Sequence, residues 1–396
     1  MRVQPQWAGE SRLGEGMVLD NTIQAPAIPP DGLTLKERFR RTMSFQDVDL
    51  RPNFEFGYWD TTLTEWHKQG LPADVHDEAS AYDYFGIENW HVLNVNSVPL
   101  PLHQYVAMSE DNDHLLIRDE WGVIAEVNTF GPQTIPHYID FPVKDAASWE
   151  PFEAALDPEA PQRWKDFEAS VEIAKRSTRP IGVYAGSLVG TARNIMGFER
   201  MATLPYEDPA LFERIVSAFG RCAVAVLERA LPHAEVDFGL GWEDMCFNQG
   251  PLIPPDVFRK VVGPWIRRIA DTLAAHGCHV YATDTDGNIN PIVDVFLDNG
   301  LNTMFPVEVH AGSDPCALRD RYSSRIKLWG GVDKRKLMDT KQTIDEELER
   351  LRPYVEDGGF IPTVDHRVPD DVPLSNYLYY LDRKREVLHV GGDPKY

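Results

Sequence analysis

Carboxylates, histidines and a lysine follow several apolar runs of the chain, each near the expected end of a strand. In residues 236–244, a period of two puts Phe238 on one face and Gly239 and Glu243 on the other, so Glu243 would point into the mouth of a barrel. Asp284 and Asp286 stand two residues apart. Because neighbouring carboxylates do not both ionise easily, this pair predicts either a divalent metal ion or a carboxylic acid of raised pKa.

Two further regions add groups that could transfer protons. In residues 304–312, Phe305, Val307 and Val309 would face the surrounding helices, while Glu308 and His310 would share the inner face. Lys334 follows the next strand, and the pair Asp365–His366 follows a later glycine-rich apolar run. The catalytic candidates are therefore Glu243, Glu308, His310, Lys334 and Asp365, and the candidate metal ligands are Asp284, Asp286 and His366.

Each of these segments also has a structural interpretation. Glu243 could cap a helix, and Asp286 with Gly287 and Asn288 could form an ordinary turn. Glu308 and His310 could form a structural ion pair. Residue types and spacing alone leave these alternatives open.

The elements that would position these residues alternate between strands and helices from about residue 145, which is the pattern of a parallel sheet. We expect strands at 181–188, 236–243, 279–284, 302–309 and 327–332, and helices near 190–203, 209–231, 255–275, 290–299, 314–323 and 341–354. A doubly wound sheet usually has a glycine-rich phosphate turn, and the chain contains neither GxGxxG nor GxxxxGKS/T. We therefore predict an α/β fold with a single (β/α)₈ TIM-type barrel, whose active site lies at the C-terminal ends of the strands.

The first part of the chain adds to this barrel. Residues 1–33 are rich in proline near their end and are expected to form an N-terminal arm, with the barrel spanning 34–390. The apolar run 53–59 is predicted as the first buried strand. Two β-rich runs within 114–128 surround a turn with glycine and predict an inserted β-hairpin.

The composition limits the classes of partner. The formal net charge is −23, so we expect binding neither to nucleic acid nor to an anionic membrane. Four scattered cysteines form no CxxC pair, which suits a reducing cytoplasm. No apolar run approaches the roughly 20 residues that span a bilayer. We therefore expect a cytoplasmic protein.

The same segments resemble the uroporphyrinogen-decarboxylase-like superfamily, in particular its bacterial branch related to corrinoid-linked methyltransferases. The resemblance is carried by Gly-Trp-Glu-Asp-Met at 241–245, Asp-Thr-Asp-Gly-Asn at 284–288, Gly-Gly-Val-Asp-Lys-Arg at 330–335 and Ile-Pro-Thr-Val-Asp-His at 361–366. It extends over about residues 34–383. It implies one barrel that serves either cofactor-free porphyrinogen decarboxylation or zinc-dependent methyl transfer, and by analogy a homodimer.

Two departures from the superfamily's patterns bear on the reaction. The decarboxylases carry an Arg-rich N-terminal motif that binds substrate carboxylates, whereas the matching residues 51–60 contain no arginine beyond Arg51. The methyltransferases bind zinc through His-x-Cys and a later Cys, and these positions resemble Asp284-x-Asp286 and the region of His366. The resemblance therefore implies oxygen and imidazole ligands for a metal such as Zn²⁺ or Mn²⁺.

These observations lead first to an enzyme that acts on a small organic molecule by metal-assisted methyl transfer or demethylation, with a corrinoid on a partner protein as one possible cofactor. The second hypothesis is metal-free decarboxylation of a carboxylic acid, with no cofactor and with Asp or His as the proton relay. The third is a non-catalytic barrel that binds a small molecule.

Overall fold

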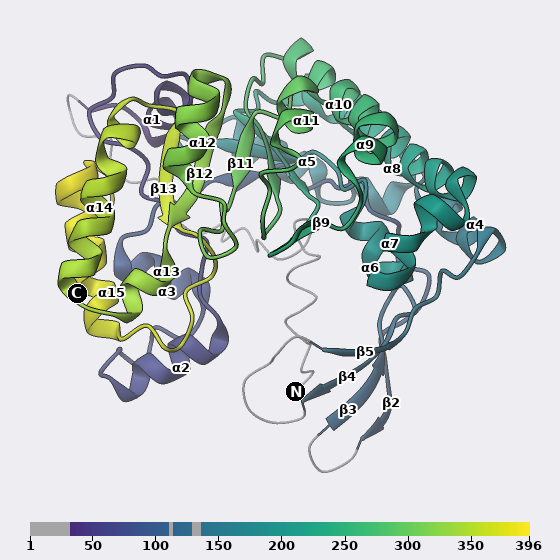
Figure 1. Ribbon diagram of the computed structural model, residues 1–396, viewed down its shortest axis with the longest axis horizontal. Helices are drawn as coiled ribbons and strands as arrows, with labels where there is room; N and C mark the ends of the chain where they lie inside the picture. Colours follow the sequence, from purple (N-terminus) through teal and green to yellow (C-terminus); the bar gives the residue numbers. More distant parts are fainter. Residues whose placement is uncertain (1–31, 111–113, 129–135) are drawn as a thin grey trace.

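The fold is built on a parallel β-sheet that curls around an apolar interior (Figure 1). The computed structural model describes residues 32–110, 114–128 and 136–396, so nearly all of the expected arm at 1–33 lies outside the described residues. Within these residues seven parallel strands follow one another across the sheet in chain order. They are β1 (His91–Val92), β6 (Ile181–Tyr184), β7 (Phe238–Trp242), β10 (Tyr281–Asp284), β11 (Thr303–Phe305), β12 (Lys327–Val332) and β13 (Phe360–Val364). The expected α/β fold of the TIM-barrel type is confirmed.

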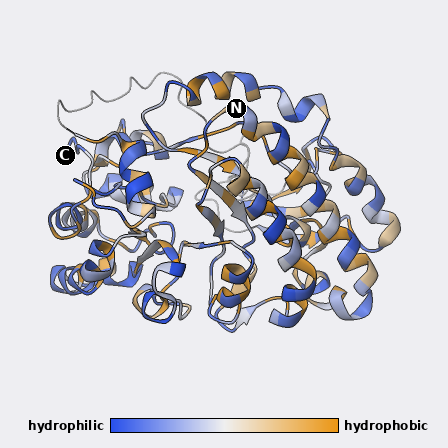
Figure 2. Cartoon of the chain, turned by 90° about the horizontal axis from the view of Figure 1, so that it is seen from above, coloured by the Kyte–Doolittle hydropathy of each residue, from blue (hydrophilic) through white to orange (hydrophobic). Residues whose placement is uncertain are grey.

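Helices connect these strands and cover the outer face of the sheet (Figure 1). Hydrophilic and hydrophobic residues lie side by side along them (Figure 2), as in helices with one buried side. In α8, for example, Leu211, Ile215, Ala218 and Cys222 are buried at spacings of three and four residues. The α-helices are α1 (Leu35–Met43), α2 (Asp60–Lys68), α3 (Glu78–Phe85), α4 (Ala146–Ala155), α5 (Phe167–Ala174), α6 (Gly190–Met196), α7 (Phe198–Glu207), α8 (Pro209–Ala230), α9 (Pro255–Val257), α10 (Gly263–Ala275), α11 (Val293–Asp298), α12 (Pro315–Tyr322), α13 (Lys334–Met338), α14 (Lys341–Glu356) and α15 (Leu374–Leu388). Short 3₁₀ turns are η2 (Pro161–Trp164), η3 (Leu231–His233) and η5 (Ser323–Arg325).

Large aromatic side chains fill the interior of the sheet. The ring of Trp329 on β12 lies 4.9 Å from Trp90, 5.4 Å from Phe238 and 5.5 Å from Phe305, measured between centroids. Helix α1 packs below them at the N-terminal end of the strands, where Phe39 lies 5.3 Å from Phe238. The interior is therefore a packed core, and the opposite, C-terminal ends of the strands are left for polar residues.

The inner and outer faces of two strands are the reverse of those predicted. Phe305 belongs to the interior cluster with Phe238 instead of facing the helices. Gly239, which was expected to lie inside, faces the outer layer, where a Cβ atom would lie 2.7 Å from Leu273 of α10. Glycine on the outer face of the strand lets helix α10 approach closely. The large rings, such as Phe238, occupy the inner face. The period of two was correct, but it was assigned to the wrong faces.

Segment 53–59, predicted as the first strand, is irregular and lies between the two edge strands of the sheet. The carbonyl of Asn53 accepts the N–H of Glu88, which comes shortly before β1, at 2.9 Å. The carboxylate of Glu55 accepts the N–H of Val364 in β13, also at 2.9 Å. The segment therefore occupies the place that an eighth strand would take in a closed barrel.

A fully buried ion pair holds this segment. The ammonium of Lys384 on α15 lies 2.7 Å from Glu55 Oε1, and neither side chain is exposed. Lys384 also donates to the carbonyl of Phe54 at 2.9 Å, and the hydroxyl of Tyr380 donates to Glu55 at 2.8 Å. Such a pair is strongly coupled to the fold, because either charge left alone would be buried without a partner.

A four-stranded antiparallel sheet projects from the barrel (Figure 1). Its strands are β2 (Val106–Glu110), β3 (His114–Arg118), β4 (Ile124–Asn128) and β5 (His137–Asp140). The predicted hairpin at 114–128 forms as β3 and β4, and Asp119 stabilises its turn by accepting the N–H groups of Trp121 at 3.0 Å and Val123 at 2.8 Å. A further two-stranded hairpin pairs β8 (Cys246–Phe247) with β9 (Gly250–Pro251).

Two predicted elements differ in extent. The strand predicted at 302–309 ends at Phe305, because Pro306 has no N–H to donate and Val307 has a φ of 61°. The helix predicted at 255–275 is divided into α9, the π-turn η4 (Phe258–Val262) and α10.

Among the described helices, none combines the length and the apolar character needed to cross a membrane.

Candidate active site

Polar side chains from neighbouring strand ends meet at the C-terminal end of the sheet. Asp286, two residues after β10, and His366, two residues after β13, form an ion pair with 3.3 Å between Oδ2 and Nε2. The imidazole ring stacks on Trp59, with 5.6 Å between centroids, and meets Phe56 edge-on at 5.7 Å. Both aromatic residues belong to segment 53–59. The position of the imidazole is therefore set from two sides, by a carboxylate and by aromatic packing.

The surroundings of this pair favour a protonated imidazole. Burial lowers the pKa of His366, but the hydrogen bond and the negative charge of Asp286 outweigh burial, so the pKa lies above its ordinary value. The charge of Lys334 lowers this pKa and that of Glu308 raises it. An imidazolium held in this way can deliver a proton to a bound molecule.

A second charged pair flanks the first. Arg193 of α6 binds Asp244, just after β7, with 2.9 Å from Nη1 to Oδ2 and 2.6 Å to the carbonyl oxygen. The guanidinium also lies over the ring of Trp242 at 5.4 Å. Burial raises the pKa of Asp244, the charge of Arg193 opposes this rise, and the charge of Asp286 adds to it. The two carboxylates are therefore near enough to influence each other.

A third pair, Glu308 with Lys334, is linked to the first through the backbone. Glu308 Oε1 lies 3.0 Å from Lys334 Nζ, and Oε2 accepts the N–H of Gly287 at 3.0 Å. Gly287 has a φ of 83°, and a Cβ atom there would lie 2.5 Å from the carbonyl of Cys246, so only glycine fits this turn. Glu308 thus fixes the residue next to Asp286. The chain bends at Gly287, as in the turn that the sequence left open as an alternative for 286–288, and this bend contributes to the geometry of the site.

Asp365 lies beneath these pairs and is fully buried. Its oxygens accept the backbone N–H groups of Lys334 at 3.1 Å and Val309 at 2.9 Å. Burial raises the pKa of Asp365 to about 6, although the charge of Lys334 and the two N–H groups oppose the rise. Asp365 therefore ties together the two backbone segments that carry Glu308 and Lys334, and it positions that pair.

Glu243 has a similar anchoring role at the next strand end. Its carboxylate is buried and accepts the N–H groups of Leu188 at 2.8 Å, Val189 at 2.8 Å and Gly190 at 3.1 Å. Burial raises its pKa to about 7, against the effect of these hydrogen bonds. The side chain thus holds the start of α6, the helix that carries Arg193. This arrangement matches the helix-capping interpretation of Glu243 that the sequence left open.

The last two predicted residues, His310 and Asp284, also lie at the C-terminal end of the sheet but outside the three pairs. His310 is exposed and its Nδ1 lies 3.0 Å from a guanidinium nitrogen of Arg335, so Glu308 and His310 contact different cations. Asp284 ends β10, and its carbonyl accepts the N–H groups of Glu243 at 2.8 Å and Asp244 at 3.1 Å. It therefore joins the ends of β10 and β7 through its backbone.

The side chains at this end of the sheet do not fit a metal ion. Asp286 and His366 bind each other, and Asp244 is bound by an arginine. In residues 32–110, 114–128 and 136–396, no three His, Cys, Asp or Glu side chains come together as a group that could hold a metal. Burial also raises the pKa of Cys246 to about 12, so its side chain is a neutral thiol in the metal-free protein. Asp284, Asp286 and His366 are thus not assembled as a three-ligand site.

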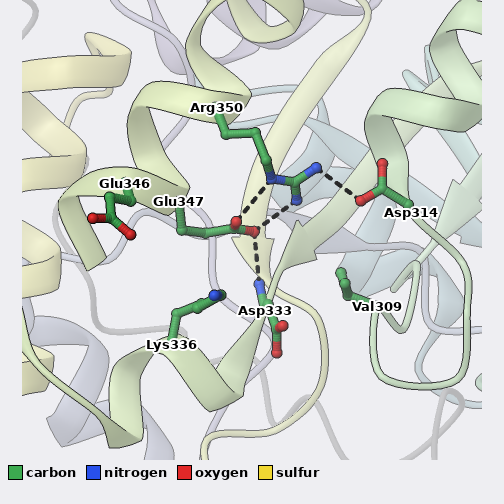
Figure 3. Close-up of a pocket in the computed structure, with 7 residues that line it drawn as sticks. All are labelled: Val309, Asp314, Asp333, Lys336, Glu346, Glu347 and Arg350. Atoms are coloured by element: carbon green, nitrogen blue, oxygen red, sulfur yellow. Dashed lines mark hydrogen bonds and ion pairs between the residues drawn. The ribbon is translucent and has the colours of Figure 1, made fainter. Parts of the chain in front are cut away.

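A cavity of about 390 Å³ lies beside the site, between the loop after β11 and helices α13 and α14 (Figure 3). Its lining residues are Val309, Asp314, Asp333, Lys336, Glu346, Glu347 and Arg350. Arg350 binds Glu347 at 2.9 Å and Asp314 at 2.8 Å, so much of the charge in the cavity is already paired. None of the residues predicted for catalysis or metal binding lines it.

Sequence reasoning missed Asp244, Arg193, Phe56 and Trp59. Asp244 stands next to a predicted residue, but a period of two loses its meaning where the strand ends. Arg193 lies early in the predicted helix that follows β6. A cation shortly after the C-terminal end of a strand was the signal that could have identified it as a site residue. The two aromatic residues were assigned to a buried strand.

Comparisons with known proteins agree with this architecture. The family model described as Uroporphyrinogen decarboxylase (URO-D) matches residues 125–387. A solved structure of a methyltransferase from Methanosarcina mazei has a TM-score of 0.58 and 15% sequence identity, over 90% of this chain and 100% of that one. A B12-independent methionine synthase from Shewanella sp. W3-18-1, solved with selenomethionine, has a TM-score of 0.35 and 15% identity over 55% of this chain and 66% of that one, which is too low to bear on the fold. No curated protein matches the sequence. Since the family model covers well over half of its length, the chain belongs to the uroporphyrinogen decarboxylase (URO-D) family.

Proposed function

We propose that this enzyme decarboxylates a small organic acid, and that His366 protonates the carbon atom that loses CO₂. The observation that carries the proposal is the ion pair between His366 and Asp286, 3.3 Å long, at the C-terminal end of the sheet. This is the end at which TIM-barrel enzymes place their active sites. The pair supplies an imidazole that is held in place and whose protonated form is favoured by Asp286.

The reaction balances with the groups present. The bond between the substrate carbon and its carboxylate carbon breaks, CO₂ leaves, and the electron pair stays on the substrate carbon, where an unsaturated group of the substrate itself has to delocalise it. The imidazolium of His366 gives its proton to this carbon, and the neutral imidazole then takes a proton from solvent. Asp286 stabilises the charged form of the imidazole before the transfer. Arg193 and Lys334 add positive charge near an anionic substrate.

One observation favours this reaction over methyl transfer, the first expectation from the sequence. Metal-assisted methyl transfer needs a ligand set, and the described residues do not bring one together. The fold shared with the Methanosarcina mazei methyltransferase extends to 90% of this chain, but at 15% identity it supports the fold alone. A corrinoid partner protein therefore belongs to methyl transfer, which is now the second candidate function. A small acid is favoured over a porphyrinogen because residues 51–60 contain a single arginine.

The test is release of CO₂ from a panel of small carboxylic acids labelled in the carboxylate, with and without a strong chelator. We expect release from at least one acid that persists with the chelator. His366→Gln should slow this release by about 100-fold or more, the usual contribution of a general acid. His276→Gln, an exposed position at the end of α10, is the matched control and should leave the rate unchanged.

Two outcomes contradict the proposal. The first is release that stops with the chelator and returns with Zn²⁺ or Mn²⁺. The second is methyl transfer from a methylated corrinoid or to a thiol, without any release of CO₂. Either result would favour the methyltransferase alternative.

A further inference from the structure

The two oxygens of Asp286 differ in their surroundings. Oδ2 pairs with His366 Nε2 at 3.3 Å. Oδ1 is buried as well, but within the described part of the chain no group donates a hydrogen bond to it. A buried carboxylate oxygen without a donor is unfavourable, because it has lost its hydration without gaining a partner. At a site for a small molecule, such an atom is an acceptor prepared for a donor on the ligand.

The charges around Asp286 indicate what kind of donor fits. Asp286 pairs with the imidazole of His366, whose protonated form it favours, and its neighbour Asp244 pairs with the guanidinium of Arg193 at 2.9 Å. Each carboxylate therefore already has one cation, and an added ammonium group would gain little from them. A neutral O–H donor satisfies Oδ1 without adding a charge.

The position of Asp286 is fixed well enough to select such a group. The next residue, Gly287, is held by the carboxylate of Glu308 at 3.0 Å and has no room for a side chain. The other side of the imidazole is packed on Trp59. Oδ1 is thus held by a turn that Glu308 anchors, beside the group that would deliver the proton.

We propose that Asp286 Oδ1 accepts a hydrogen bond from a hydroxyl group of the substrate, so that the substrate is a hydroxy-substituted carboxylic acid. This inference rests on the proposed decarboxylation for the carboxylate and adds the hydroxyl group. Asp286 is then a specificity-determining residue in addition to being the partner of His366. A site that is built to bind a hydroxyl group rejects analogues without it strongly, because its own polar atom is then left unpaired.

The experiment compares matched pairs of acids that differ in one hydroxyl group: lactate with propionate, mandelate with phenylacetate, and salicylate with benzoate. Binding to the full chain is measured by calorimetry, and CO₂ release is measured in parallel. We expect at least one hydroxy acid to bind about 100-fold more tightly than its counterpart. In Asp286→Leu, which removes the acceptor, this ratio should fall to about one.

His366→Gln is the matched control. It should slow CO₂ release but keep the preference for the hydroxy acid, because an amide can still contact Asp286 while the acceptor remains. A loss of overall structure alone would weaken both members of a pair and leave their ratio unchanged. Asp286→Ala, which also removes the acceptor, is the second variant if Asp286→Leu does not fold, and it should likewise bring the ratio to about one.

The two proposals fail in different ways. Equal binding of every hydroxy acid and its counterpart, or no binding of any hydroxy acid below about 10 mM, would overturn the inference. So would a preference that survives in Asp286→Leu. A preference in binding without CO₂ release from any acid would instead overturn the decarboxylation and leave the hydroxyl site standing.

Discussion

His366 can act as an acid only while its imidazole is protonated, and Asp286 extends the pH range in which it is. Burial lowers the pKa of His366, but the hydrogen bond and charge of Asp286 raise it beyond its ordinary value of 6.5. Since the pKa is raised, the imidazolium is fully present at low pH and is lost as the pH rises through the shifted value. The proposed activity should follow the same curve.

We therefore expect kcat to fall on the alkaline side of its pH profile, with an apparent pKa above 6.5. In Asp286→Asn the opposing effect of burial remains while the negative charge is gone, so this limb should move to lower pH. The measurement is kcat against pH for both proteins with the same acid. A limb that stays in place in Asp286→Asn would show that another group titrates.

The carboxylates at the strand ends divide into two kinds that the sequence could not separate. Glu243 and Asp365 accept backbone N–H groups of distant loops and act as anchors. Asp286 and Glu308 instead pair with the side chains of His366 and Lys334, and Glu308 also accepts the N–H of Gly287 with its second oxygen. Every one of these acids follows a strand, so the strand-end rule found them. Which of them meets a loop depends on residues more than 20 positions away, and no local pattern encodes that.

Among the elements, segment 53–59 carries the two aromatic side chains that pack on His366, and a buried ion pair holds it in place. Glu55 and Lys384 lie 2.7 Å apart with no exposed surface, and Lys384 also donates to the carbonyl of Phe54. Removing one partner leaves a charge buried without compensation. The pair therefore couples α15 to the site.

Lys384→Met should lower the free energy of unfolding by about 3–5 kcal/mol, because it leaves the Glu55 carboxylate unpaired. The double variant Glu55→Gln/Lys384→Met should recover part of this loss, since neither side chain is then charged. Urea denaturation of the three proteins gives the values. Equal stability of Lys384→Met and the unchanged protein would mean that the pair does not hold the segment.

Much of the fold could be predicted from local pattern, and the exceptions share one cause. Strand 327–332 and the strands near 181, 238 and 281 were found because apolar runs of suitable length stand between helices. By contrast, β1 has only two residues, which form a strand through their pairing with β6. Segment 53–59 is as apolar as a strand but is irregular. Hydrogen bonds to distant segments decide both cases.

At the scale of the whole molecule, acidic groups dominate. The chain has 62 Asp and Glu residues and 39 Lys and Arg residues, which gives a formal net charge of −23. Several arginines on the surface are engaged with acids, such as Arg214 and Arg221 with Glu153 and Arg229 with Glu159. The field of the protein therefore repels anions, and the paired cations at the site have to offset this field locally for an acid to bind.

The same field leads to a prediction about macromolecular partners. Binding to nucleic acid depends on cations that neutralise phosphates and release counterions, and a chain with a net charge of −23 lacks the excess of positive charge that this needs. We expect no retention on DNA or RNA columns at about 150 mM salt, where the favourable contribution of counterion release has already fallen steeply. Retention at or above that salt concentration would contradict the prediction. Such retention would mean that a basic patch on the surface binds the nucleic acid despite the negative net charge. Salt bridges elsewhere on the surface are screened at this salt concentration and would not account for it.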